Sequence, residues 1–107
     1  MVRRRFDVFR NPNPKSQRTV PYLVLLQSEL LEELPTQVVA PLVRSSALAG
    51  RAATRLNPSF ELEGEAVFLL TQQIGAVPTR SLTNRITSLE QDRDLIVAAL
   101  DLLFSGI

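Results

Sequence analysis

The segment SLEQDRDLIVAALDLLFSGI (residues 88–107) decides how the rest of the chain can fold. Its apolar side chains recur at helical spacing in two adjoining stripes, so we expect one amphipathic helix. The first stripe is wide enough to pack a single helix on a sheet, and the second indicates either contact with another subunit or deeper burial in the chain's own core. The first stripe consists of Leu89, Ile96, Leu100, Leu103 and Phe104, and the second of Leu95, Ala99 and Leu102.

The sequence also predicts where this helix begins and ends. Ser88 and Gln91 have the spacing of a capping box, in which the serine hydroxyl accepts from the glutamine N–H and the glutamine side chain reaches back. The helix is predicted to run to Phe104, and Gly106 is predicted to end it in the left-handed conformation. Negative side chains at positions 90, 92 and 94 suit the positive end of the helix dipole.

Upstream of the helix, the pattern is mostly that of β-strands. The run at 20–27 is densely apolar and short enough for a buried strand, and Pro41 indicates that its strand is an edge or contains a bulge. Glu63 and Gly64 separate two runs and predict a hairpin turn. The predicted strands span residues 5–10, 20–27, 37–43, 60–62, 66–71 and 74–77.

Three segments between these strands have weaker patterns. Residues 11–16 contain two X-Pro pairs, which favour an extended or turning loop. Residues 29–34 fit either one helical turn or a loop, ended by Pro35. Residues 46–56 are rich in alanine, which favours a helix, but Gly50 lies in the middle and the apolar face is thin.

The composition excludes several classes of function. The chain has 107 residues, 12 basic and 11 acidic side chains, and no His, Cys or Trp. We therefore expect one domain over residues 1–107, without a thiolate nucleophile, an imidazole base, a metal site or a cofactor. An enzyme of this composition would depend on carboxylates, arginines, hydroxyl groups, Tyr22 or Lys15.

Charge and hydropathy limit the expected partners. The net charge of +1 gives no whole-molecule attraction to nucleic acid or to a membrane surface. Residues 1–20 are locally basic; a solvated strand end explains this more simply than a nucleic-acid arm, so we expect no direct nucleic-acid binding. No secretory signal or stretch of about 18 apolar residues is present, so a cytoplasmic protein without membrane contact is expected.

In its order of motifs, the chain resembles the CcdB toxin family, and the resemblance covers nearly its whole length. The segments Leu-Leu-Gln-Ser-Glu-Leu-Leu (25–31) and Phe-Ser-Gly-Ile (104–107) are the most specific parts. Val-Val-Ala-Pro-Leu (38–42) and Gly-Ala-Val-Pro (75–78) lie between them in the family's order. The loop at 11–19 is longer than in the family.

This resemblance implies a mainly β fold with a C-terminal α-helix, namely an SH3-like β-barrel, in a homodimer. It also implies a toxin that is not an enzyme: it binds the GyrA subunit of DNA gyrase, traps the enzyme on cleaved DNA, and is neutralised by a CcdA-like antitoxin. The gyrase-binding positions carried over from the family are Leu30, Leu31, Asp101, Phe104, Ser105, Gly106 and Ile107.

Two of these positions depart from the family pattern. Ser105 replaces a tryptophan that anchors the family's contact with gyrase, and Asp101 replaces an asparagine one turn earlier. Truncating an aromatic anchor of this kind typically costs about 2–4 kcal/mol of binding free energy. An exposed carboxylate that pairs with an arginine returns only about 0–1 kcal/mol.

Two alternatives follow from these departures and from the fold class. One is a binding module of the same fold that keeps its antitoxin but has a lost or altered target. The other is a MazF-like endoribonuclease, for which Arg44, Arg51 and Thr54 are the candidate residues. The Phe-x-Gly-Ile ending favours the gyrase-binding branch over this enzyme.

Overall fold

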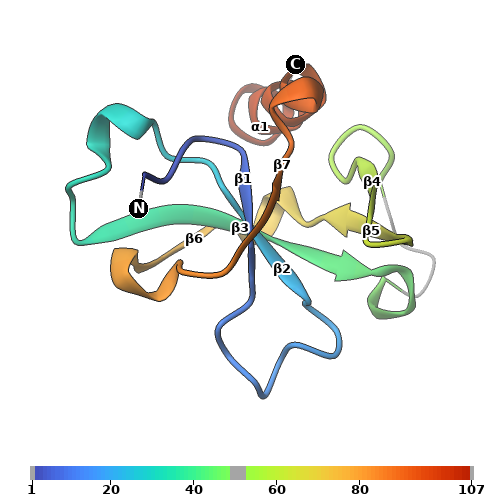
Figure 1. The fold of residues 1–107 in the computed structure, drawn as a ribbon. Helices are drawn as coiled ribbons and strands as arrows, with labels where there is room; N and C mark the ends of the chain where they lie inside the picture. Colours follow the sequence, from blue (N-terminus) through green and yellow to red (C-terminus); the bar gives the residue numbers. More distant parts are fainter. Residues whose placement is uncertain (1, 49–52, 107) are drawn as a thin grey trace.

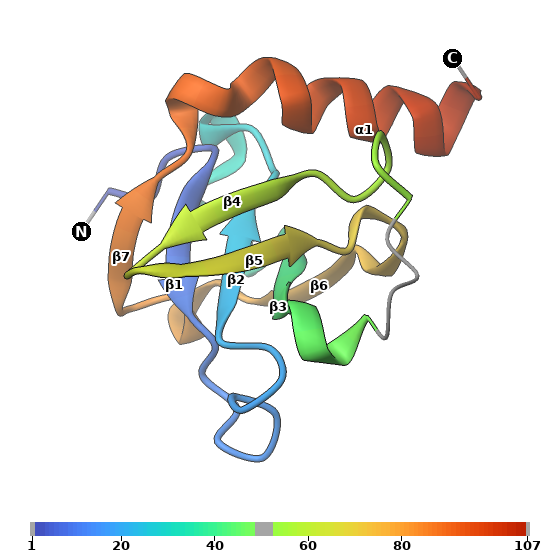
Figure 2. The same ribbon diagram turned by 90° about the vertical axis from the view of Figure 1, so that its right-hand side faces the viewer.

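A computed structural model describes residues 2–48 and 53–106 of the chain. Within these residues, antiparallel strands form one curled sheet in the order β4-β5-β3-β2-β1-β7, and β6 pairs separately with β3. The sheet bends into a half-barrel, and the helix α1 lies along one side of it (Figures 1 and 2). The structure confirms the predicted class, which is mainly β with a C-terminal helix.

The strands alternate with short turns of 3-10 helix, and the only long helix of the described residues comes last. The strands are β1 (Asp7–Arg10), β2 (Tyr22–Leu25), β3 (Thr36–Arg44), β4 (Ser59–Leu62), β5 (Glu65–Leu69), β6 (Gly75–Pro78) and β7 (Arg85–Ser88). The 3-10 turns are η1 (Glu29–Leu31), η2 (Ser45–Ala47), η3 (Thr71–Gln73), η4 (Thr79–Ser81) and η5 (Glu90–Asp92), and α1 spans Arg93–Ser105.

Strand β2 is buried on both faces, which explains the dense apolar run that predicted it. It lies between β1 and β3, and alternate side chains point to opposite sides. Tyr22 and Val24 join the larger core cluster with Ile96 of α1, whereas Leu23 and Leu25 join a smaller cluster on the other face. The curled sheet therefore has apolar cores on both sides.

The structure corrects the prediction that Pro41 marks an edge strand or a bulge, because β3 is the central strand. On one side β3 pairs with β2, and on the other it pairs first with β6 at 36–39 and then with β5 at 42–44. Pro41 falls between these two partners. Its carbonyl accepts from Leu70 N at 3.0 Å, so the backbone nitrogen and carbonyl of Pro41 face the gap between β6 and β5. Proline, which has no N–H to donate to a partner strand, fits at this place.

The β4–β5 hairpin confirms the predicted turn. Glu63 and Gly64 both have positive φ, of 52° and 80°. Two successive residues of this kind form the type I′ turn, whose twist matches that of the flanking strands. Phe60 pairs with Val67 across the hairpin, and both side chains reach the larger core cluster.

The end of α1 is confirmed, whereas the predicted cap at its start is wrong. Ser88 Oγ accepts from Glu90 N at 3.1 Å, at the first residue of the 3-10 turn η5, and does not cap an α-helix through Gln91. This tighter turn leads from β7 into α1, which begins at Arg93. Gly106 adopts φ 73° and its N–H donates to Leu102 O at 3.0 Å, as a left-handed C-cap does.

The two apolar stripes of α1 divide differently from the prediction. Ile96 of the first stripe and Ala99 of the second are both fully buried against the sheet. Leu95 and Phe104 are 52% and 70% exposed. The buried face of the helix therefore combines residues of both predicted stripes. Leu95 and Phe104 lie on opposite sides of this face and remain exposed.

Two parts of the chain were not anticipated. The short, polar strand β7 pairs with β1 at the edge of the sheet, and its four residues alternate too weakly to predict a strand. The alanines of residues 46–56 favoured a helix, but the described part of this segment does not form one. It consists of the 3-10 turn η2 and a turn around Thr54. Positions 49–52 lie outside the described residues.

We expect Ile96→Ala to lower the free energy of unfolding by about 2–5 kcal/mol, because it opens a cavity between α1 and the sheet. Val2→Ala, which lies in none of the proposed contact surfaces, is the control. Since Val2 is 63% exposed, its truncation is expected to cost at most about 0.5 kcal/mol. Urea unfolding monitored by circular dichroism measures both, and equal losses would contradict this packing.

Candidate functional site

The structure places the predicted site residues in two separate groups. Asp101, Phe104, Ser105 and Gly106 gather at the end of α1, whereas Leu30 and Leu31 belong to η1. Figure 2 shows η1 toward the start of α1 and the C-terminus at its other end. A thirteen-residue helix is about 20 Å long, so one protomer does not bring the two groups together.

The end of α1 presents an exposed aromatic side chain on a rigid support. Phe104 is 70% exposed. One turn earlier on the same helix, Ala99 is fully buried and the partly buried Leu100 packs on the core. Asp101 and Ser105 are also exposed, and the Gly106 cap fixes the last turn. Ile107, the remaining predicted residue, lies outside the described residues.

The turn η1 presents an apolar patch formed by Leu30, Leu31 and Leu34. These side chains are 91%, 48% and 47% exposed, respectively. The turn starts at Ser28, whose hydroxyl accepts from Leu30 N at 3.2 Å. Because three exposed leucines lie within five residues, this patch is a candidate contact surface.

A buried amide holds the leucine patch in place, and the sequence analysis did not identify it. Gln37, which is 1% exposed, shares its two N–H groups among the carbonyls of residues 31, 32 and 34 and the hydroxyl of Thr79, at 3.2–3.4 Å. Thr79 Oγ1 in turn donates to Leu34 O at 2.6 Å. A glutamine at the start of an otherwise apolar strand is the sequence feature that could have indicated this role.

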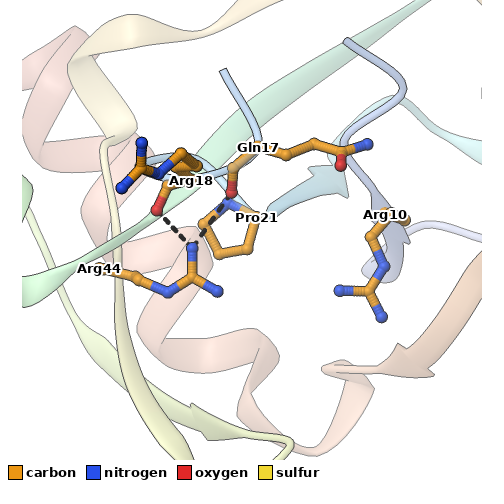
Figure 3. Close-up of a pocket in the computed structure, with 5 residues that line it drawn as sticks. All are labelled: Arg10, Gln17, Arg18, Pro21 and Arg44. Atoms are coloured by element: carbon orange, nitrogen blue, oxygen red, sulfur yellow. Dashed lines mark hydrogen bonds between the residues drawn. The ribbon is translucent and has the colours of Figure 1, made fainter. Parts of the chain in front are cut away.

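A hollow of about 410 Å³ opens beside the loop between β1 and β2 (Figure 3). This loop lies at the other end of the molecule from α1 (Figure 1). The lining of the hollow is unusually basic and comes from three elements: Arg10 ends β1, Gln17, Arg18 and Pro21 lie in or next to the loop, and Arg44 ends β3. Arg10 and Arg18 belong to the excess of basic residues at positions 1–20, for which the sequence alone favoured a solvated strand end.

Carboxylates hold two of these arginines. Arg10 Nη2 donates to both oxygens of Glu63, at 3.1 and 3.3 Å, and its guanidinium lies 5.2 Å from the centre of the Tyr22 ring. Arg44 Nε donates to Glu65 Oε2 at 2.9 Å. Both carboxylates come from the β4–β5 hairpin, so this hairpin orients the basic wall of the hollow.

The Tyr22 hydroxyl donates to the same Glu63 carboxylate, and this contact shifts the pKa of both groups. The hydrogen bond from Tyr22 and the charge of Arg10 lower the pKa of Glu63, although partial desolvation opposes them. Burial raises the pKa of Tyr22, and the hydrogen bond to the carboxylate and its negative charge raise it further. At neutral pH the arrangement is therefore a phenol, a carboxylate and a guanidinium.

A second carboxylate, Asp7, is buried with 2% of its side chain exposed. Arg85 Nε lies 3.2 Å from Asp7 Oδ1, although the two groups are not aligned for a hydrogen bond. Asp7 Oδ2 accepts from Arg4 N at 2.9 Å. This pair joins β1 to the edge strand β7 and is explained by the fold alone.

The residues considered for an endoribonuclease do not form a site within the described residues. Arg44 lines the basic hollow, where Glu65 and two carbonyls already bind it. Thr54 lies in an exposed turn beyond β3, and Arg51 is outside the described residues. Over residues 2–48 and 53–106, no three His, Cys, Asp or Glu side chains are grouped so that they could hold a metal ion. None of the helices there is long and apolar enough to cross a membrane.

We expect the free energy of unfolding to fall as the pH drops below about 4.3, the ordinary value for a glutamate, because Glu63 then loses its charge. Its folded-state pKa is lowered, so its contribution is present above the ordinary pKa and disappears as the pH falls through the lowered value. Glu63→Gln keeps an acceptor for Tyr22 and is expected to flatten this part of the acid dependence.

Urea midpoints at about pH 7 and about pH 3 measure the effect. Glu61→Gln, an exposed neighbour on the same hairpin, is the control and should retain the acid dependence of the wild type. If Glu63→Gln and the wild type lose the same stability between the two conditions, the stabilising role of the charged Glu63 is wrong.

Comparison with known proteins gives one family. The model of the family described as CcdB protein matches residues 5–106. The match includes both η1 and the end of α1 up to Gly106, and it confirms the resemblance found in the sequence. No curated protein sequence matches the chain at a significant level.

Proposed function

Because this chain belongs to the CcdB family, we propose that it binds the GyrA subunit of DNA gyrase and traps the enzyme on cleaved DNA. Membership itself supports a toxin of a toxin–antitoxin system; the gyrase target and neutralisation by a CcdA-like antitoxin are the further steps of the proposal. Such a toxin acts by binding and not as an enzyme, and it works in the cytoplasm, where gyrase and DNA are.

The observation that carries the proposal is the exposure of Phe104 at the end of α1. An aromatic side chain that is 70% exposed contributes nothing to the core, yet the helix that carries it is firmly packed through Ile96 and Ala99. Aromatic residues on rigid elements are typical anchors of protein interfaces, because they bury a large area and lose little conformational entropy. Phe104 is also one of the positions that the family uses for gyrase.

The leucine patch on η1 supports the same proposal. Leu30 and Leu31 are the aliphatic pair carried over from the family, and they are exposed on a turn whose carbonyls Gln37 holds. A patch that is braced in this way is available to a partner without a large loss of flexibility on binding. We propose that Leu30 and Leu31 contact gyrase together with Asp101, Phe104, Ser105, Gly106 and Ile107.

A homodimer would reconcile the two separated groups with one target surface. In one protomer, α1 keeps Leu30 apart from Phe104, but a second copy brings another pair of these groups into the same assembly. The half-exposed Leu95 and the partly exposed Leu102 and Leu103 provide apolar surface for an association of two copies.

Ser105 determines how strong the gyrase contact is expected to be. It is exposed beside Phe104, at the position where the family has its tryptophan anchor. A serine cannot supply that buried area, so we expect weaker binding to gyrase than the family pattern provides, or a target surface of different shape. Asp101, one turn earlier, adds an exposed carboxylate that suits a basic target.

The direct test is a DNA-cleavage assay with gyrase from the source organism, with and without the protein. We expect linear plasmid to accumulate with the wild type and to disappear with Phe104→Ala, because the anchor is lost. Lys15→Ala, in the loop at the opposite end of the molecule, is the control and should act like the wild type. Absence of linear plasmid with the wild type would leave the altered-target module as the better assignment.

Ser105→Trp tests the same surface in the other direction. We expect it to tighten binding to GyrA by about 30-fold or more, since a new aromatic anchor supplies about 2 kcal/mol or more. Surface plasmon resonance measures the affinity, and thermal unfolding should show no large change because the position is exposed. Equal affinities for the wild type and the variant would mean that this end of α1 is not the contact surface.

We also expect the protein to be a homodimer in solution. Analytical ultracentrifugation over a wide concentration range should give twice the mass of one chain at high concentration. A mass of one chain at every concentration would rule out the dimer, and the two groups of site residues would then require a partner that spans both.

A further inference from the structure

The basic hollow of Arg10, Gln17, Arg18, Pro21 and Arg44 has no part in the proposed gyrase contact. In both views of the ribbon, the loop at 11–19 extends from the end of the sheet that is remote from α1. The proposed gyrase residues lie on η1 and α1, and none of them lines the hollow. The hollow is therefore free to bind a separate ligand.

We propose that this hollow binds a phosphoryl group, carried either by a phosphate monoester or by a phosphodiester backbone. Figure 3 shows the guanidinium groups of Arg10 and Arg44 turned toward each other across the hollow. Each of them is paired with a carboxylate of the hairpin, and within the described residues no acceptor is bonded between them. An anion placed between them can therefore accept from both sides.

The unused N–H groups support this proposal. A guanidinium has five N–H donors. The bonds of Arg10 to Glu63 use only Nη2, and those of Arg44 use Nε and Nη1. Nε and Nη1 of Arg10 and Nη2 of Arg44 are therefore available. Arg18 is exposed and makes no side-chain hydrogen bond to the described residues, so its guanidinium can turn toward an anion.

The two facing arginines are, in addition, already held in place by the protein. Arg10 lies over the ring of the buried Tyr22 and is bonded to Glu63. Arg44 donates to Glu65, to Gln17 O at 3.1 Å and to Arg18 O. Long side chains lose much conformational entropy when they are ordered on binding. Here the protein has ordered them beforehand, so an anion gains their donors at little further loss.

The charges and shape favour phosphate over a carboxylate. Three arginines line the hollow and two carboxylates bind two of them, which leaves a local charge of +1 for an anion to neutralise. A carboxylate offers two coplanar oxygens and suits one guanidinium fork. A phosphoryl group is tetrahedral, so different pairs of its oxygens can face Arg10 and Arg44 at once. The volume of about 410 Å³ leaves space for a sugar or base attached to it.

Two variants test the site without unfolding the protein. Arg44→Lys keeps the charge but loses the planar fork that phosphate recognition uses, and Arg18→Gln removes the exposed third arginine. Arg80→Gln, on the exposed turn η4, is the matched control. Circular dichroism and thermal unfolding confirm that each variant is folded before binding is measured.

Isothermal titration calorimetry and amide chemical shifts report binding of inorganic phosphate, adenosine monophosphate, a short single-stranded RNA and a hexaglutamate peptide. We expect the phosphate-bearing compounds to shift the amide signals of the loop at 11–19. Their affinity should fall on the order of tenfold in Arg44→Lys and in Arg18→Gln, and should be unchanged in Arg80→Gln. Equal affinity for the monophosphate and RNA identifies a monoester site; much tighter, strongly salt-dependent RNA binding identifies a backbone site.

Three results would overturn the proposal. The first is binding of phosphate that none of the arginine variants weakens. The second is binding of the hexaglutamate peptide alone, which would make the hollow a site for acidic peptides. The third is no phosphate binding by the wild type at millimolar concentration.

Discussion

The fold depends on the exchange of partners along β3. This strand pairs with β2 over one edge, and its other edge is divided between β6 and β5 at Pro41. As a result, β5 and β6 leave the same edge of β3 at different places. Leu89 and Ile96 lie over one concave core, while the second cluster fills the opposite side.

The sequence predicted the parts of the fold in which local chemistry and the final environment agree. The apolar run of β2, the Glu63-Gly64 turn and the Gly106 cap were all correct, because each is decided by the residues that form it. The Pro41 and Ser88 predictions were wrong, since tertiary pairing decided them: an exchange of partner strands in one case and a 3-10 turn before α1 in the other.

The candidate site was predictable to a smaller extent. Exposure of Phe104 and of Leu30 follows once the helix and the turn are placed, and the resemblance named both positions. The bracing by Gln37 and the hollow around Arg44 depend on contacts between residues distant in sequence, for example with Thr79 and Glu65. No spacing along the chain encodes such contacts, although the basic residues near the N-terminus and the polar Gln37 were visible as anomalies.

The amide of Gln37 connects the leucine patch to the sheet through an uncharged side chain. All of its partners are acceptors, namely the carbonyls of the turn and the Thr79 hydroxyl. A glutamate of nearly the same shape would face these oxygens with negative charge, and the turn would open. This position thus requires a donor and not merely a side chain of the right shape, and a screen for loss of toxicity would recover changes at Gln37 that never touch the target.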